Sequence, residues 1–218
     1  MLTLTLEKPG ANPAKRLQLS LNKGARFTVK VEWQCNAAHE DDVDIHALEA
    51  RNSGNGARVT ALESILSTYN TQKMNPKGGA LLNAPDGSFA TPSGGLRHSG
   101  DIRTQGNYET ITIDGSKIPV DVNEIPLFAT VHKADHNEEH EGGSESEEEA
   151  AFADIETCTV TIAAEGGKVL GSYRLSSEFG EFNVVQLGSV MLNDGVWEYA
   201  PVGRGFTGTI NDVLAQFS

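Results

Sequence analysis

Two short stretches of the chain carry oxygen-bearing side chains at a spacing that suits metal binding. Residues 98–111 read HSGDIRTQGNYETI, and residues 42–48 read DVDIHAL. Calcium is a hard cation that takes about six to eight oxygen ligands, so a site needs several such side chains converging from different segments. The candidate ligands in these two stretches are Asp42, Asp44, Asp101, Asn107 and Glu109.

The loop at 98–111 also has an interpretation without metal. In an ordinary turn, the carboxylate of Asp101 accepts hydrogen bonds from nearby backbone amides, and Arg103 pairs with an acidic neighbour. His98, Ser99 and Asp101 are the residue types of a hydrolase triad, but they are neighbours in one loop and the chain has no G-x-S-x-G motif. His46 and His98 are therefore predicted to be structural rather than catalytic.

The segments that must position these side chains are predicted to be strands. The apolar segments are short and rich in Val, Ile, Thr and Phe, and in FTVKVEW (27–33) apolar and polar residues alternate, as in a sheet with one face in water. Asp42 and Asp44 stand two residues apart at the start of such a segment, so both side chains are expected on one face. Strands are predicted at 17–22, 25–33, 43–50, 108–114, 125–132, 157–164, 169–175 and 182–193.

Helix is predicted at only two places, 60–70 and 206–218, where apolar residues recur at helical spacing; Thr209 is placed to cap the second helix. Glycine-containing turns at 164–168 and 192–197 are typical of hairpins. The expected fold class is all-β: a β-sandwich of two antiparallel sheets in a single domain, with a few short peripheral helices.

Large aromatic side chains and the two cysteines are expected inside this fold. Cys35 and Cys158 have neither CxxC spacing nor a histidine at zinc-ligand spacing, so buried thiols are favoured over a disulfide or a zinc site. The aromatic residues predicted to fill the core between the sheets are Trp33, Trp197, Phe128 and Phe206.

The charge balance excludes some classes of partner. The chain has 17 Lys and Arg against 30 Asp and Glu, a formal net charge of −13, whereas nucleic-acid binding requires clustered basic residues. No apolar run approaches the roughly 20 residues that cross a bilayer, and the opening MLTLTLEKPG lacks the basic start and apolar core of a signal peptide. We expect a cytoplasmic protein with no nucleic-acid partner and no direct membrane insertion.

Residues 135–149, DHNEEHEGGSESEEE, carry much of the excess negative charge. The segment has eight acidic residues and no lysine or arginine. Such a run cannot bury apolar area and is expected to be a flexible acidic insertion. It is interpreted either as a solvated loop or as a loose cation trap assisted by His136 and His140.

Seven segments, in their order along the chain, resemble those of the TerD family of bacterial tellurium-resistance and stress proteins. They are LNKGARFTV (21–29), VEWQC (31–35), DVDIHAL (42–48), HSGDIRT (98–104), KIPVDVNEIPLFATVH (117–132), GSYRLSSEF (171–179) and GVWEYAPVGRGFTGTINDVLAQF (195–217). The resemblance covers nearly the whole chain, and its ending is the most specific part.

The resemblance implies a β-sandwich without enzymatic activity that binds calcium through acidic loops at one end. It places the loop that carries Asp101, Asn107 and Glu109 next to the start of the strand that carries Asp42 and Asp44. It also implies a role in resistance to tellurite and other stresses. The implied partners are other proteins of a tellurium-resistance operon, including membrane-bound ones.

The chain departs from the family pattern inside the acidic loop. The family loop reads G-D-N-x-T-G followed by a run of aspartates that ends in D-D-E, whereas this chain reads GDIRTQGNYE, with Ile102 in place of the asparagine. Because fewer carboxylates attract a divalent ion less strongly, at least one of the family's calcium sites is expected to have lost its ligands. The alternative function is a metal-free interaction or scaffold module of the same system, which docks a basic or membrane-associated partner.

Overall fold

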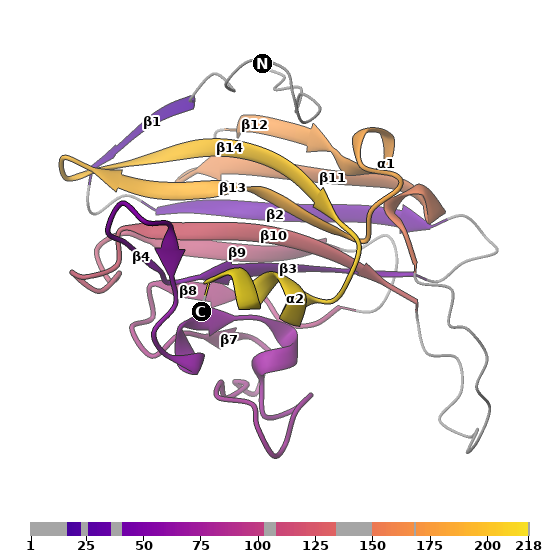
Figure 1. Ribbon diagram of the computed structural model, residues 1–218, viewed down its shortest axis with the longest axis horizontal. Helices are drawn as coiled ribbons and strands as arrows, with labels where there is room; N and C mark the ends of the chain where they lie inside the picture. The colour runs from indigo at the N-terminus through magenta and orange to yellow at the C-terminus, as the bar shows by residue number, and fades with distance from the viewer. Residues whose placement is uncertain are drawn as a thin grey trace.

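Two antiparallel sheets packed face to face form the body of the protein (Figure 1). The computed structural model describes residues 17–22, 26–35, 41–102, 108–133, 150–167 and 169–217. The acidic segment 135–149, for which a flexible insertion is predicted, lies outside the described residues. The fold class predicted from the sequence is confirmed.

The strand order brings segments that are distant in sequence side by side. The first sheet contains, in spatial order, β1 (Leu17–Asn22), β14 (Val196–Phe206), β13 (Val184–Asn193), β10 (Glu124–His132), β3 (Asp42–Leu48) and β6 (Ile65–Leu66). The second contains β12 (Val169–Arg174), β11 (Ile155–Ala164), β2 (Arg26–Cys35), β9 (Tyr108–Asp114), β8 (Leu96–His98) and β7 (Phe89–Ala90). A separate two-stranded ribbon pairs β4 (Arg51–Asn52) with β5 (Ala57–Arg58). The two predicted hairpins are present as β11–β12 and β13–β14.

Short helical segments lie at the periphery of the sheets. They are η1 (Leu62–Ser64), η2 (Thr68–Asn70), η3 (Phe152–Asp154), α1 (Leu175–Glu178), α2 (Ile210–Leu214) and η4 (Ala215–Phe217). Within the described part of the chain, no helix has the length and apolar character needed to span a membrane.

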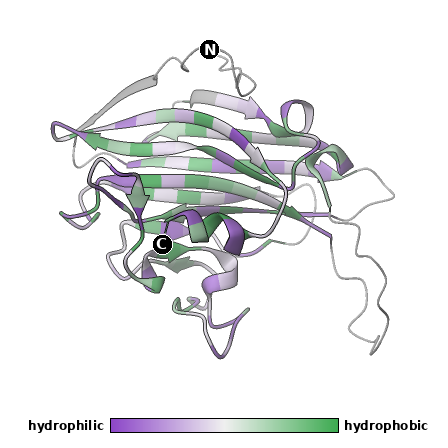
Figure 2. Cartoon of the chain, viewed as in Figure 1, coloured by the Kyte–Doolittle hydropathy of each residue, from purple (hydrophilic) through white to green (hydrophobic). Residues whose placement is uncertain are grey.

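The core between the sheets follows from the alternation of side chains along the strands. In β2, Val29, Val31 and Trp33 are at most 2% exposed, whereas the polar residues between them are partly or fully exposed. Figure 2 shows the same alternation as bands of contrasting hydropathy along the strands. Because alternate side chains of a strand point to opposite faces, each sheet presents one apolar face to the other.

A second apolar cluster lies on the outer face of the first sheet, under α2 and η4. Phe128 packs edge-on against Phe217, with ring centroids 5.6 Å apart, and Phe206 joins the same cluster. The prediction that Phe128 and Phe206 lie between the sheets is therefore wrong, because the register of β10 turns Phe128 outward and the C-terminal helix covers it. Trp33 and Trp197 do lie between the sheets, as predicted.

The continuous helix predicted at 60–70 is also wrong, because the segment forms η1, the short strand β6 and η2. Ile65 and Leu66 pair with β3 at the sheet edge. Nδ2 of Asn70 donates to the carbonyl oxygens of Leu62 and Ile65, both at 2.8 Å. Strand pairing and these side-chain hydrogen bonds replace helical backbone bonds, so tertiary contacts outweigh the helical periodicity.

Strand β14 has eleven residues, but only its start, at the predicted hairpin turn 192–197, is indicated by the sequence pattern. Pro201, Gly203 and Gly205 lie within it, and these residue types usually mark turns. Gly205 has a packing role here, because a Cβ at this position would overlap the ring of Phe182. Gly205 is therefore explained by the close approach of the strand backbone to the ring of Phe182, and not by a turn.

Thr209 caps α2, as predicted. Its hydroxyl accepts a hydrogen bond from the backbone N–H of Asp212 (3.3 Å), and the Asp212 carboxylate accepts one from the backbone N–H of Thr209 (2.8 Å). We expect Thr209→Ala to lower the free energy of unfolding by about 1 kcal/mol. Urea denaturation measures the change, with the exposed Thr207→Ala as the control. An equal loss in both variants would show that the cap contributes nothing.

Candidate metal centre

Three carboxylates from distant parts of the chain meet at one end of the sandwich. Asp44 on β3, Asp101 in the loop before β9 and Glu109 on β9 each place a carboxylate oxygen within 4.8 Å of the other two. Asp44 belongs to the first sheet and Glu109 to the second. The structure therefore brings together the two stretches whose oxygens were predicted to share a pocket.

Asp42 and Asn107 are the remaining predicted ligands. Asp42 is the first residue of β3 and is partly buried. Burial, together with the negative charges of Asp44 and the other clustered carboxylates, raises the pKa of Asp42 to about 8. Its carboxyl group therefore lies in the electrostatic field of the cluster. Asn107 lies outside the described residues, so its part in the site stays a prediction.

Glu109 is fully buried and is held by backbone amides from strand β3 and from the loop before β9. Its Oε2 accepts a hydrogen bond from the N–H of Ile45 (3.3 Å), and its Oε1 accepts one from the N–H of Ile102 (3.1 Å). Ile45 lies beyond the two residues of β3 that pair with β6, so the glutamate takes the place of a strand partner there. Burial and then the charge of Asp44 raise the pKa of Glu109 to about 10.

Asp44 makes a complete hydrogen bond through one oxygen, and the hydroxyl of Thr68 lies close to the carboxylate without completing a second. Its Oδ2 accepts a hydrogen bond from the hydroxyl of Tyr69 (3.2 Å) and lies 3.9 Å from Nε2 of His132. Its Oδ1 is buried and has no hydrogen-bond partner among the described residues. Burial and then the charge of Asp101 raise the pKa of Asp44, and the nearby hydroxyl of Thr68 partly offsets the rise. Because an unpaired buried carboxylate oxygen costs free energy unless a cation or proton meets it, Oδ1 is the atom that most directly indicates a ligand.

The turn at Ser99 and Gly100 delivers Asp101 to this cluster. The N–H of Ser99 donates to the carbonyl oxygen of Thr110 (2.9 Å), and Oγ of Ser99 accepts from the N–H of Thr110 (3.0 Å). Gly100 has a φ of +114°, and a Cβ there would lie 3.0 Å from the carbonyl oxygen of Gly87. Glycine is required at this position, and the turn then fixes where Asp101 emerges.

His46 and His98 are both buried, and each ring has one nitrogen without a hydrogen-bond partner among the described residues; the structural role predicted for them stays a prediction. Nε2 of His46 lies 2.9 Å from Oγ1 of Thr130. Nδ1 of His98 accepts a hydrogen bond from the N–H of Gly100 (3.1 Å), and its ring stacks on Phe89 with centroids 4.6 Å apart. Burial lowers the pKa of His46, and it lowers the pKa of His98 to about 4. Both rings are therefore neutral near pH 7.

Two further residues, His132 and Tyr69, lie at the site without a signal in the sequence that singles them out. His132 is opposite Asp42 in the register of β10 and β3, and its Nε2 lies 2.8 Å from Oγ1 of Thr130. The ring of Tyr69 stands edge-on to that of His132, with centroids 5.2 Å apart. Tyr69 belongs to the segment for which a helix is predicted, and only the observed break in that segment brings it to Asp44.

This arrangement suits the binding of a hard divalent cation better than nucleophilic catalysis. Carboxylates gathered in a buried site repel one another and hold protons when no cation balances them. A divalent cation would take up their oxygens and remove the repulsion. The two cysteines offer no activated nucleophile, because both are buried, as predicted, and burial raises the pKa of Cys158.

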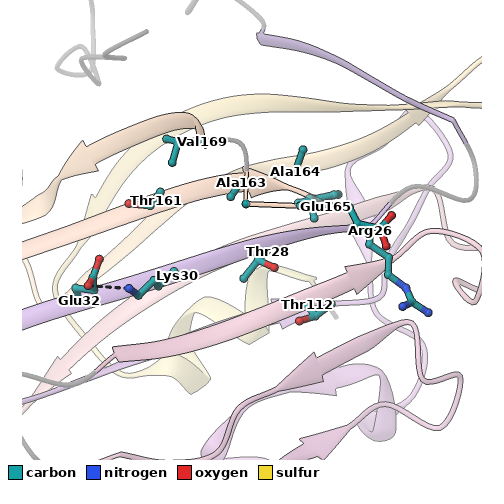
Figure 3. Close-up of a pocket in the computed structure, with 13 residues that line it drawn as sticks. Arg26, Thr28, Lys30, Glu32, Thr112, Thr161, Ala163, Ala164, Glu165 and Val169 are labelled. Atoms are coloured by element: carbon teal, nitrogen blue, oxygen red, sulfur yellow. Dashed lines mark ion pairs between the residues drawn. The ribbon is translucent and has the colours of Figure 1, made fainter. Parts of the chain in front are cut away.

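A shallow hollow on the outer face of the second sheet is a weaker candidate (Figure 3). Its lining crosses β2, β9, β11 and β12 and includes several threonines. Three of its charged side chains are already paired: Nζ of Lys30 lies 2.7 Å from Glu32, and Arg26 lies 2.7 Å from Asp114. The hollow therefore lacks the converging, unbalanced charges that distinguish the carboxylate cluster.

Comparison with known proteins matches this chain to one family model and to individual relatives. The model of the TerD domain family matches residues 87–217. The tellurium resistance protein TerD of Serratia marcescens is 22% identical over 207 residues, which cover 91% of this chain and 92% of that protein. YceE of Bacillus subtilis (strain 168) is 29% identical over 121 residues, which cover 54% of this chain and 57% of YceE. The match to YceE thus spans less than two thirds of that relative.

A solved structure has the same architecture. It is that of a homologue of telluride resistance protein (TerD) from Streptomyces coelicolor A3(2), with a TM-score of 0.59 and 17% sequence identity. The likeness covers 87% of this chain and 95% of the other. At 17% identity, this match supports the fold alone.

Proposed function

This chain belongs to the TerD family of tellurium-resistance and stress proteins, and on that premise we propose that it binds calcium and has no catalytic activity of its own. The ion would be held by Asp44, Asp101 and Glu109, with Asp42 adding negative charge. The observation that carries this proposal is Oδ1 of Asp44, a buried carboxylate oxygen without a hydrogen-bond partner among the described residues.

The properties of the cluster support calcium over magnesium. Magnesium keeps several of its waters and demands near-ideal octahedral geometry, whereas calcium accepts irregular sets of carboxylate, carbonyl and water oxygens. Here Asp44 is 2% exposed and Glu109 is fully buried, so a heavily hydrated ion fits the site poorly. Water and backbone oxygens would complete the coordination of calcium.

The physiological role that we infer is that of a calcium-responsive component of tellurite or stress resistance. Family membership supports this role. The partners that we propose are other proteins of a tellurium-resistance operon, including membrane-bound ones. A cytoplasmic location stays an expectation from the sequence.

Isothermal titration calorimetry tests the proposed ion. We expect wild-type protein to bind calcium, and we expect Asp101→Asn to weaken the affinity about tenfold, because the variant removes one of three clustered negative charges. The matched control is Glu63→Gln, which makes the same charge change at an exposed residue of η1. Equal calcium affinities of wild type and Asp101→Asn would mean that Asp101 is not a ligand of the ion.

The second candidate function is a metal-free interaction module that docks a basic or membrane-associated partner. It is favoured by one observation: Ile102 stands where the family pattern has an asparagine, so this chain has lost an oxygen ligand. Absence of any calorimetric signal from wild-type protein at millimolar calcium would favour this second function and reject the first.

A further inference from the structure

The ring of His98 is held in one orientation and one tautomer. The side chain is fully buried, and its ring lies nearly parallel to that of Phe89, at an interplanar angle of 17°. Nδ1 accepts a hydrogen bond from the N–H of Gly100 (3.1 Å). A ring nitrogen that accepts a hydrogen bond cannot also carry a proton, so Nε2 carries the proton of the neutral imidazole.

The protonated nitrogen of His98 faces the carboxylate cluster. Nε2 lies 3.2 Å from Oε2 of Glu109, the oxygen that also accepts from the N–H of Ile45. The contact has ion-pair distance but not the alignment of a complete hydrogen bond, and Nε2 has no other hydrogen-bond partner among the described residues. A buried donor therefore stands near two acceptors, the carboxylate of Glu109 and the backbone of Ile45, without a complete hydrogen bond to either.

We propose that His98 is a positioning residue of the calcium centre, and this inference rests on the proposed function. With calcium bound, the fixed Nε2–H would complete a hydrogen bond to Oε2 of Glu109, which lies 3.2 Å away, and would hold the carboxylate in the orientation that meets the ion. Groups that hydrogen-bond to metal ligands in this way orient them and tune affinity. The hydrogen bond from Gly100 contributes to this role. Because its N–H donates to Nδ1, the proton of the imidazole stays on Nε2, the nitrogen that faces Glu109.

Two substitutions at His98 separate positioning from packing. In His98→Gln, the amide nitrogen falls near the place of Nε2 and keeps a donor to Glu109. In His98→Asn, the amide oxygen falls near the place of Nδ1 and keeps the acceptor for Gly100 but loses that donor. Both variants lose the ring that stacks on Phe89. We expect His98→Asn to weaken calcium binding about 10- to 100-fold and His98→Gln to stay within a few-fold of wild type.

The outcomes of the calorimetry are distinct. Calcium binding by wild type with an equal loss in both variants would mean that His98 serves packing alone, and it would overturn this inference while leaving the proposed function intact. No binding by wild type would overturn the proposed function, and the inference with it. Circular dichroism of each variant checks that it is folded before the titration.

A measurement on the unaltered protein keeps the inference testable if a variant does not fold. Long-range ¹H–¹⁵N correlation spectra of ¹⁵N-labelled wild-type protein identify which ring nitrogen of His98 is protonated. We expect the proton on Nε2 in the absence of calcium, and a changed resonance of that proton when calcium is added. A proton on Nδ1, or an Nε2 proton that is indifferent to bound calcium, would overturn the inference.

Discussion

Replacing Asp44 by asparagine is expected to stabilise the calcium-free protein and to abolish its response to calcium. Asp44 is 2% exposed, lies beside Asp101 and Glu109, and has one buried oxygen without a hydrogen-bond partner among the described residues. Asparagine has the same shape, carries no charge, and offers an N–H₂ donor to the neighbouring carboxylates. Its carbonyl oxygen can still accept from the hydroxyl of Tyr69.

The expected size of this gain is about 1 to 2 kcal/mol, which is typical when a site kept for function is relieved of unfavourable charge. For a chain of this length, it corresponds to a rise in Tm of about 2 to 8 °C. Thermal unfolding in the presence of a chelator measures the rise. In wild type, calcium at about 100 times its Kd should add about 2.7 kcal/mol of stability, and the variant should show none of this.

The control for this experiment is Glu63→Gln, which removes a charge from an exposed position. We expect it to change Tm little in either condition and to leave the calcium response intact. A fall in Tm for Asp44→Asn in the chelator would mean that the carboxylate of Asp44 stabilises the ion-free fold, and the proposed site would lose its main support.

Raising the pH is expected to destabilise the calcium-free protein between about pH 7 and about pH 10, and calcium is expected to oppose this. In the unfolded chain, Asp42 and Glu109 have their ordinary pKa values, 3.8 and 4.5; folding raises them to about 8 and about 10. Below about pH 6.5 the buried histidines act in the opposite sense, because burial lowers their pKa values and the unfolded chain binds protons that the folded state does not. Above that pH the folded state binds more protons than the unfolded state, so the free energy of unfolding falls as pH rises. The stabilisation that these two carboxyl groups contribute is complete below about pH 4. It is lost as the pH rises through their pKa values in the folded state.

The expected slope is on the order of 1 kcal/mol per pH unit for each such group. Urea unfolding at several pH values, in chelator and in calcium, measures it. Carboxyl groups whose pKa is lowered, such as those of Asp86 and Asp114, act in the opposite sense but below their ordinary value of 3.8, outside this window. Asp44→Asn should flatten the profile in chelator. Parallel profiles with and without calcium would contradict a site built from these carboxylates.

Strands with clear alternation could be predicted from the sequence almost residue for residue. The segments 17–22 and 108–114 coincide with β1 and β9. The short edge strands β6, β7 and β8 have only two or three residues each, too few to show a period, and their existence depends on longer neighbours. Most of strand β14 is not predicted, because glycine usually marks a turn. The structure shows that Gly205 is needed instead for close packing against the ring of Phe182.

The candidate site could be predicted only in part. The types and spacing of Asp44, Asp101 and Glu109 identify oxygen ligands, and the family resemblance implies that they meet. Nothing in the spacing identifies the hydroxyl of Tyr69 or the ring of His98 as their partners, because both contacts depend on how the two sheets approach each other. Aromatic and imidazole groups have many structural uses, so their residue type alone carries little information about a site.

The hydrogen bond from Ile45 to Glu109 also bears on solubility. Exposed backbone amides along the margin of a sheet can recruit strands from other molecules and begin intermolecular β-pairing. Strand β6 is too short to protect the whole margin of β3, and the buried glutamate occupies an amide that β6 does not reach. Because Ile45 and Glu109 are both buried, this hydrogen bond leaves no free amide there for another strand to pair with, which gives Glu109 a structural role apart from any ion.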